Sequence, residues 1–131
     1  MSYIGNVIGQ TKGNKDFRQV LFTGAKSQLV VMSVPPGGEI GLETHPNVEQ
    51  TLFFLSGQGE AILDGKKQAI GGGDVVVVTP GTAHNIVNTG KESLQIYTVY
   101  APANHIDGRV HKTKAEADAD AADEDFGHAV K

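Results

Sequence analysis

Residues 37–57, GGEIGLETHPNVEQTLFFLSG, join a turn-rich segment that carries metal-binding side chains to a strand-like segment. Glu43 and His45 are two positions apart, so on an extended chain both side chains point to the same face. Residues 50–56 (QTLFFLS) are typical of a strand that the following Gly-Gln-Gly brings to an end. The stretch therefore predicts a carboxylate and an imidazole side by side, close to the start of a strand.

A second segment has the same character. Residues 73–88, GDVVVVTPGTAHNIVN, place His84 at the start of a predicted strand, directly after a turn that contains Pro80 and Gly81. These are the two segments of the chain in which several side chains suited to metal binding lie near turns. Gly71-Gly72-Gly73 reads as a turn, because no Lys and no helix follow it as in a phosphate-binding loop.

Strand-like runs recur along the chain at short intervals, each closed by a turn signal. This pattern predicts an all-β barrel or sandwich, with Asp64-Gly65 as the strongest hairpin signal. The four consecutive valines at 75–78 suggest a strand covered on both faces or one at a subunit contact. The predicted strands are residues 28–34, 50–56, 60–63, 66–70, 74–79, 84–88 and 94–100.

The end of the chain differs in composition. Residues 114–125 (KAEADADAADED) contain alanine and acidic residues but no β-branched residue, which predicts a short helix or a solvated acidic tail. We therefore divide the chain into a β-barrel at 1–112 and an acidic, alanine-rich tail at 113–131. His105 and His111 precede this tail, and one hypothesis is that His111 closes over a pocket.

Length and composition limit the possible functions. The chain has 131 residues, which fits one domain, and no cysteine, which excludes disulfides, thiolate metal sites and a cysteine nucleophile. Its net charge of −4 argues against nucleic-acid or anionic-membrane partners. No apolar run approaches the ~20 residues that cross a bilayer, and the first residues lack a signal-peptide pattern. We expect a cytoplasmic protein.

The two segments resemble the two signature motifs of the cupin superfamily. The first family motif is Gly, five residues, His-x-His, three or four residues, Glu, six residues and Gly; its positions are held here by Gly37, Glu43, His45, Gln50 and Gly57. The second is Gly, five residues, Pro-x-Gly, two residues, His, three residues and Asn; its positions are held here by Gly73, Thr79, Gly81, His84 and Asn88, with Pro80 one place after the expected Pro. The fifteen residues between Gly57 and Gly73 suit the hairpin that joins the motifs in small cupins.

The resemblance implies a single-domain jelly-roll barrel, a double-stranded β-helix, with one divalent metal ion inside its mouth. Carried over position by position, the metal ligands are Glu43, His45, Gln50 and His84. Glu43 stands where the family has His, and Gln50 stands where it has Glu, so one carboxylate remains in the set. Glu49 is the alternative ligand, although a slip of one residue turns a strand side chain to the opposite face.

The metal itself is not identified by this ligand set, because Fe, Mn, Zn and Ni all accept mixed nitrogen and oxygen ligands. If Gln50 points into the barrel, strand alternation places Leu52 and Phe54 inside as well. We take both as candidate pocket-lining residues, together with Tyr97.

Small cupins of this kind are often labelled mannose-6-phosphate-isomerase-like. The favoured function is a metal-dependent enzyme, an oxygenase, isomerase or lyase, that acts on a small polar molecule rich in oxygen. The alternative is a non-catalytic module that binds a small ligand or a metal. In either case we expect a homodimer, joined through an edge at residues 75–78 or 29–31. The sequence assigns no catalytic residue.

Overall fold

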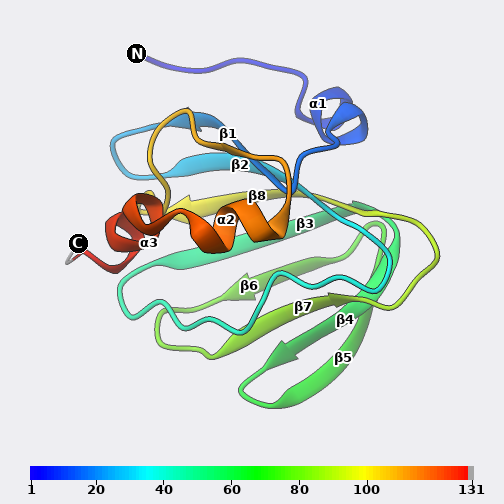
Figure 1. Cartoon of the computed structure of the whole chain (residues 1–131). Helices are drawn as coiled ribbons and strands as arrows, with labels where there is room; N and C mark the ends of the chain where they lie inside the picture. Colours follow the sequence, from blue (N-terminus) through cyan, green and yellow to red (C-terminus); the bar gives the residue numbers. More distant parts are fainter. Residues whose placement is uncertain (130–131) are drawn as a thin grey trace.

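The computed structural model describes residues 1–129 and contains two antiparallel sheets (Figure 1). One sheet has the strand order β6-β3-β8-β2-β1-β9, and the other has the order β5-β4-β7. The strands are β1 Arg18–Thr23, β2 Gln28–Val34, β3 Glu49–Ser56, β4 Gln58–Leu63, β5 Lys66–Gly71, β6 Val75–Val78, β7 His84–Asn88, β8 Leu94–Ala101 and β9 Val110–His111. The helices are α1 Val7–Gly13, α2 Lys114–Ala119 and α3 Ala121–His128.

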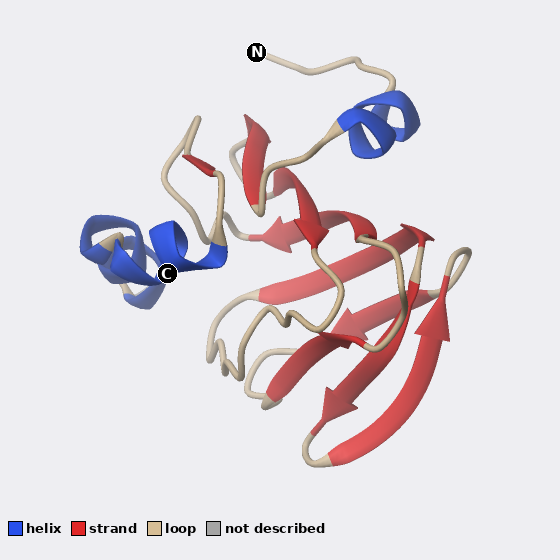
Figure 2. Cartoon of the chain, turned by 45° about the vertical axis from the view of Figure 1, so that its right-hand side comes forward, coloured by secondary structure: helices blue, strands red, loops and turns tan. Residues whose placement is uncertain are grey.

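The helices lie outside the sheets, with α1 apart from the α2–α3 pair (Figure 2). No helix within residues 1–129 is both long enough and apolar enough to cross a membrane. The architecture is mostly β, as the turn and strand pattern predicts, with a short helical segment after the last strand.

Every strand predicted from the sequence is present, and the observed bounds differ from the predicted ones by two residues at most. The sequence pattern missed α1, β1 and β9. Helix α1 (VIGQTKG) contains two glycines and has little helix propensity of its own. It is held by the Asn6 side chain, which accepts a hydrogen bond from the Gly9 amide at 3.0 Å, and by the burial of Thr11.

Strand β1 (RQVLFT) begins with two polar residues, which hide its strand character in the sequence. It forms because it pairs with β2 on one side and β9 on the other, where Arg18 lies opposite Met32 and His111. Strand β2 follows β1 after a short turn, whereas β9 comes from a distant part of the chain, so local propensity gives little sign of the second pairing.

The barrel interior is filled by side chains from both sheets. Strand β3 shows the alternation: Gln50, Leu52 and Phe54 are buried, whereas Glu49 is exposed and Phe53 is only partly buried. The buried apolar cluster joins residues of the larger sheet to Ala61, Ile70 and Ile86 of the smaller one. The alternation of inward and outward side chains thus fixes which residues of each strand reach the interior.

The four valines at residues 75–78 form a strand, but coverage on both faces, one of the two predictions for them, is not observed. Strand β6 is an edge strand of the larger sheet, and only Val76 and Val78 are buried. Val75 and Val77 keep 52% and 51% of their surface exposed, so residues 1–129 leave one face of the strand uncovered. The prediction that residues 29–31 offer an edge is wrong, because β2 is hydrogen-bonded between β1 and β8.

The acidic segment after residue 112 is helical and packs on the barrel. Thr113 caps α2 by accepting a hydrogen bond from the Glu116 amide at 3.2 Å. Ala117 and Asp123 are buried, with exposures of 8% and 5%. Of the two predictions for this segment, the helix is therefore correct and the solvated tail is not, for the residues up to 129; residues 130 and 131 lie outside the described part.

Two aspartates attach this helical segment to the chain before it. Asp120 accepts hydrogen bonds from Arg109 Nε at 2.8 Å, from Arg109 Nη2 at 3.1 Å and from His111 Nε2 at 2.9 Å. Asp123 accepts one from the Ile106 amide at 2.7 Å. The hydrogen bonds from Arg109 and then His111 hold the pKa of the Asp120 carboxyl below its ordinary range.

We expect Asp120→Asn to loosen the docking of α3, because an amide cannot accept both guanidinium hydrogen bonds with the same charge assistance. Amide hydrogen exchange in α3 should become several-fold faster, while exchange in β3 and β8 stays unchanged. The matched control is Asp118→Asn on α2, whose carboxylate is 63% exposed and contacts only Lys114 among the ion pairs of residues 1–129. Equal effects from both variants would contradict this role of Asp120.

The same contact predicts a dependence on pH. Because the folded-state pKa of Asp120 is lowered, its stabilising contribution is complete above the ordinary carboxyl pKa of about 3.9. It is lost progressively as the pH falls below that value, so α3 amides should lose protection in acid before the core strands do. Hydrogen exchange measured from pH 3 to 7, corrected for intrinsic rates, checks the order of these two events.

Candidate metal centre

Backbone pairing brings together the two segments that carry the predicted ligands. The Glu43 amide donates to the His84 carbonyl, and the His84 amide donates to the Glu43 carbonyl, both at 2.9 Å. The Gly81 amide donates to the His45 carbonyl at 2.8 Å. The segment before β3 is thus laid antiparallel to the start of β7, although about forty residues of chain separate them.

The side chains of Glu43, His45 and His84 converge at this junction. His45 Nε2 lies 2.9 Å from Glu43 Oε2, and the centroids of the two imidazole rings are 5.2 Å apart. One ligand atom from each of the three side chains lies within 4.8 Å of the other two. This spacing is compact enough for all three to reach a single ion.

The hydrogen bond to His84 leaves its other ring nitrogen suited to a metal. His84 Nδ1 lies 2.9 Å from the Thr82 carbonyl oxygen, which can only accept, so Nδ1 carries the proton and Nε2 carries the lone pair. A hydrogen bond of this kind orients many metal-binding histidines. Burial also lowers the pKa of His84, and the nearby His45 acts in the same direction.

Glu43 is kept as a carboxylate. Burial acts to raise its pKa, but the hydrogen bond from His45 and the electrostatic effects of His45 and Arg18 outweigh burial and lower the pKa overall. Neutral imidazole and ionised carboxylate are the forms that bind divalent cations. The donor set of two imidazoles and one carboxylate therefore fits a borderline ion such as Fe, Zn, Mn or Ni.

The two candidates for the remaining ligand lie on opposite faces of β3. Gln50 is 3% exposed, and its amide nitrogen donates to Thr98 Oγ1 at 3.2 Å. Glu49 is exposed on the outer face of the strand. The one-residue shift that separates them therefore turns the Glu49 carboxylate away from the barrel interior.

The three predicted lining residues lie elsewhere. Leu52 and Phe54 face inward but belong to the packed apolar core and not to the lining of the cavity near Glu43. Tyr97 is corrected outright: it is an outward residue of β8 and stacks on Phe53 with ring centroids 4.9 Å apart. Tyr100, three residues further on, is the tyrosine that points inward, and burial raises its pKa to about 12.

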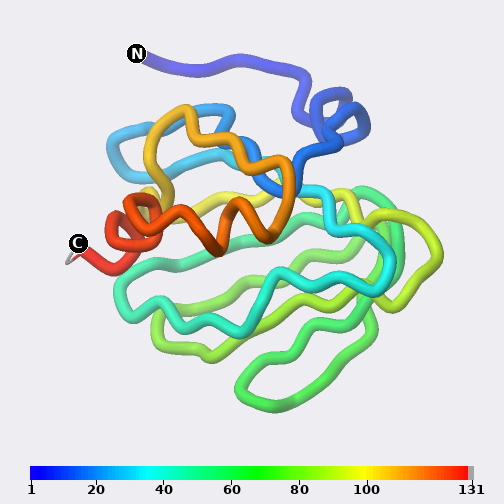
Figure 3. Tube along the Cα trace, in the orientation of Figure 1, coloured from blue at the N-terminus to red at the C-terminus, as the bar shows by residue number. Residues whose placement is uncertain are grey.

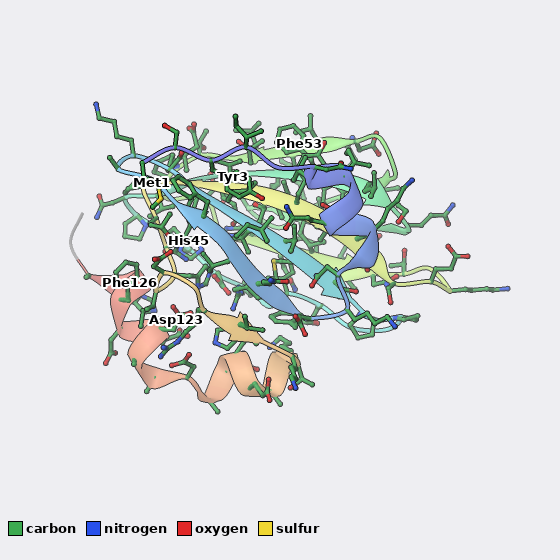
Figure 4. All side chains as sticks on the ribbon, turned by 90° about the horizontal axis from the view of Figure 1, so that it is seen from above. Met1, Tyr3, His45, Phe53, Asp123 and Phe126 are labelled. Atoms are coloured by element: carbon green, nitrogen blue, oxygen red, sulfur yellow. The ribbon has the colours of Figure 1, made fainter. Side chains whose placement is uncertain are left out.

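A cavity of about 220 Å³ opens beside Glu43 and His45. The C-terminal segment, orange to red in Figure 3, contributes several of the residues that line this cavity. Figure 4 labels His45 and Asp123, which both line the cavity although they are far apart in the sequence. Further polar lining comes from residues that the sequence did not single out as cavity residues: Arg18, Asn104, His105 and Asp123.

Weak signals of these residues exist in the sequence. Arg18 is a cation between Phe17 and the strand-like residues that follow it, and His105 precedes the acidic segment together with His111. His111 itself is buried, but it contacts Asp120 and Arg18 and does not line the cavity. His111, Asp120 and Asp123 also lie close enough for a metal, yet Arg109 already neutralises Asp120, so this group serves to dock the helices.

Comparison with known proteins agrees with this architecture. A cupin domain model matches residues 30–100. The uncharacterized protein YrkC of Bacillus subtilis is 41% identical over 121 residues, which are 88% of this chain and 65% of that protein. This chain thus spans slightly less than two thirds of the length of that relative.

Two further matches are a solved structure with the same fold and a curated protein with a similar sequence. The crystal structure of BH2720 from Bacillus halodurans superposes with a TM-score of 0.89 at 35% identity, covering 91% of this chain and 95% of the other. A Thermotoga maritima oxalate-binding protein is 35% identical over 68 residues, which are 52% of this chain and 56% of that protein. With the domain match, the barrel and the converging ligand segments in agreement, this chain belongs to the cupin superfamily.

Proposed function

We propose that Glu43, His45 and His84, with the Gln50 amide oxygen as a fourth ligand, hold one divalent metal ion, and that the protein is a metal-dependent enzyme acting on a small oxygen-rich molecule. The convergence of the first three side chains at the edge of a cavity carries this proposal. The burial of Gln50 supports its inclusion, whereas the exposure of Glu49 does not favour the alternative.

A divalent ion in this set supplies Lewis acidity to oxygen atoms of a bound substrate. The chain would contribute one carboxylate charge and two imidazoles, so a divalent ion held there would keep a net positive charge. The cavity is smaller than the ~300–1,000 Å³ typical of sites for drug-sized ligands, which favours a small substrate. Oxygenase, isomerase and lyase reactions are all compatible with this donor set.

A second candidate function is ligand binding without turnover. The name of the Thermotoga maritima relative, an oxalate-binding protein, favours it. The two functions share the metal site and differ in whether a bound small molecule is converted. Saturable binding that leaves the ligand chemically unchanged over many hours would move the proposal to the binding module.

Metal content tests the site. In protein purified without a metal-chelating tag, we expect about one divalent ion per chain by elemental mass spectrometry. His84→Ala should weaken metal affinity by at least about 100-fold, because it removes one ligand from a set with few alternatives. Binding should also weaken as the pH falls, because the imidazoles must be free of the competing proton.

Two adjacent substitutions serve as a matched pair. Gln50→Ala should weaken metal binding by about 10-fold, as expected for loss of a neutral ligand, whereas Glu49→Ala should leave it unchanged. Titration calorimetry on the apoprotein of each variant measures both metal affinities. A stronger loss in Glu49→Ala than in Gln50→Ala would overturn the ligand assignment, and no metal binding after reconstitution would overturn the metal site itself.

We further propose that the exposed face of β6 is the contact of a homodimer, since Val75 and Val77 leave apolar surface at a sheet edge. Val77→Lys should convert the dimer to a monomer in sedimentation velocity experiments. Val110→Lys, an exposed valine on the opposite edge strand β9, is the control and should remain dimeric. A monomeric unmodified protein, or a dimeric Val77→Lys variant, contradicts this contact.

A further inference from the structure

Buried polar atoms without a hydrogen-bond partner gather at one place. Within residues 1–129 such side-chain atoms are Arg18 Nε, Asn104 Oδ1 and His105 Nε2. The exposures of the three residues are 6%, 4% and 7%, and all three residues line the cavity next to Glu43 and His45. Folding normally satisfies buried polar groups, so unsatisfied atoms on three residues that line one cavity favour a polar ligand there.

Arg18 brings a buried positive charge to this cavity. Its guanidinium group lies over the Phe17 ring at 5.2 Å, and Nη1 is 3.4 Å from His111 Nδ1. These contacts leave the Nε–H as a donor without an acceptor. Since arginine stays charged in proteins, the favoured partner for this N–H is an anionic oxygen, above all a carboxylate.

His105 has the opposite hydrogen-bonding character. Its Nδ1 lies 2.7 Å from Asp123 Oδ2, while the other oxygen of Asp123 accepts from the Ile106 amide at 2.7 Å. A carboxylate can only accept, so His105 Nδ1 carries the proton and Nε2 presents a lone pair. Burial keeps His105 neutral by lowering its pKa, even though the bond to Asp123 acts to raise it.

The His105 ring is held firmly in this orientation. Its backbone amide donates to Gln28 Oε1 at 3.0 Å, and the ring packs edge-on against Tyr100 with centroids 5.0 Å apart. The Asn104 amide donates to the same Gln28 oxygen at 3.2 Å. Both unpartnered acceptors, His105 Nε2 and Asn104 Oδ1, therefore sit on one short segment that the buried Gln28 fixes.

We propose that this cavity selects a small hydroxycarboxylate, whose carboxylate accepts from Arg18 Nε–H and whose hydroxyl group donates to His105 Nε2. The inference rests on the proposed function, because it names the substrate class of the same site. A ligand of this class supplies the anionic acceptor that Arg18 Nε–H requires and the donor that His105 Nε2 requires. A dicarboxylate such as oxalate offers acceptors alone and would set its oxygens against the lone pairs of His105 and Asn104.

The test compares small ligands that differ by one group. Glycolate carries both groups, acetate lacks the hydroxyl, oxalate replaces it by a second carboxylate, and ethylene glycol lacks the carboxylate. By titration calorimetry on the full chain loaded with Zn²⁺, we expect glycolate to bind at least about 10-fold more tightly than each of the other three. Oxalate binding as tightly as glycolate would overturn the proposal.

Variants assign the preference to particular side chains. Arg18→Met should weaken glycolate binding by at least about 10-fold, whereas Lys91→Met, which removes an exposed cation on a distant loop, should not. His105→Phe keeps an aromatic ring and removes both nitrogens, so the ratio of glycolate to acetate affinity should fall towards one. If either variant fails to fold, the ligand series on the unmodified chain decides the outcome.

Repeating the series without metal separates this inference from the proposed function. A glycolate preference that persists in the apoprotein supports recognition by Arg18 and His105, even where metal binding fails. A preference that requires Zn²⁺, disappears in His84→Ala and survives in Arg18→Met is chelation by the ion alone and overturns the proposal. Long-range ¹⁵N NMR of His105 provides an independent check, because Nε2 should change its shift on adding glycolate and keep it on adding acetate.

Discussion

The reciprocal pair of backbone hydrogen bonds between Glu43 and His84 is the contact on which the site depends. It joins the irregular segment before β3 to His84, the first residue of β7, in an antiparallel bridge. The two amides and two carbonyls satisfy one another, so an irregular segment is held at the mouth of the barrel without unpaired backbone groups. The position of His45 follows from the same junction, because its carbonyl accepts from Gly81.

A second constraint is the burial of charge under the C-terminal helices. Arg18, His111, Asp120 and Asp123 are placed together by β1, β9 and the helical segment, and the hydrogen bonds among Arg109, His111 and Asp120 compensate for part of the charge. Removing one charged partner of such a group leaves the charge of the other partner buried and uncompensated. The segment that covers the cavity is therefore attached by the same kind of polar groups that line it.

The proposed metal ligands and the proposed ligand contacts are held in position by different parts of the structure. Glu43, His45 and His84 are positioned by strand pairing, which is local to the two motif segments. Arg18 and His105 are positioned by contacts between the beginning and the end of the chain. A change in how the helices dock would thus alter ligand contacts before it altered metal ligands.

Much of the fold was predictable, because strand alternation and turn residues are local properties. The spacing of Glu43 and His45, and the place of His84 after a turn, already showed side chains that a barrel would bring together. The side on which Tyr97 lies was not predictable, since strand parity depends on register with β3. The prediction that residues 29–31 form a sheet edge was wrong for a similar reason. These residues pair with β1, and the polar residues at the start of β1 hide that strand in the sequence.

The sequence by itself determined the class of fold, the barrel strands and the identity of the motif residues, since each depends on residue types at short separations. Tertiary structure alone decided that Gln50 faces inward while Glu49 does not, that the acidic segment docks as helices, and that Arg18, Asn104 and His105 meet at one cavity. Those outcomes depend on pairing between residues that lie far apart in the chain, and no local pattern encodes which distant groups will be buried together.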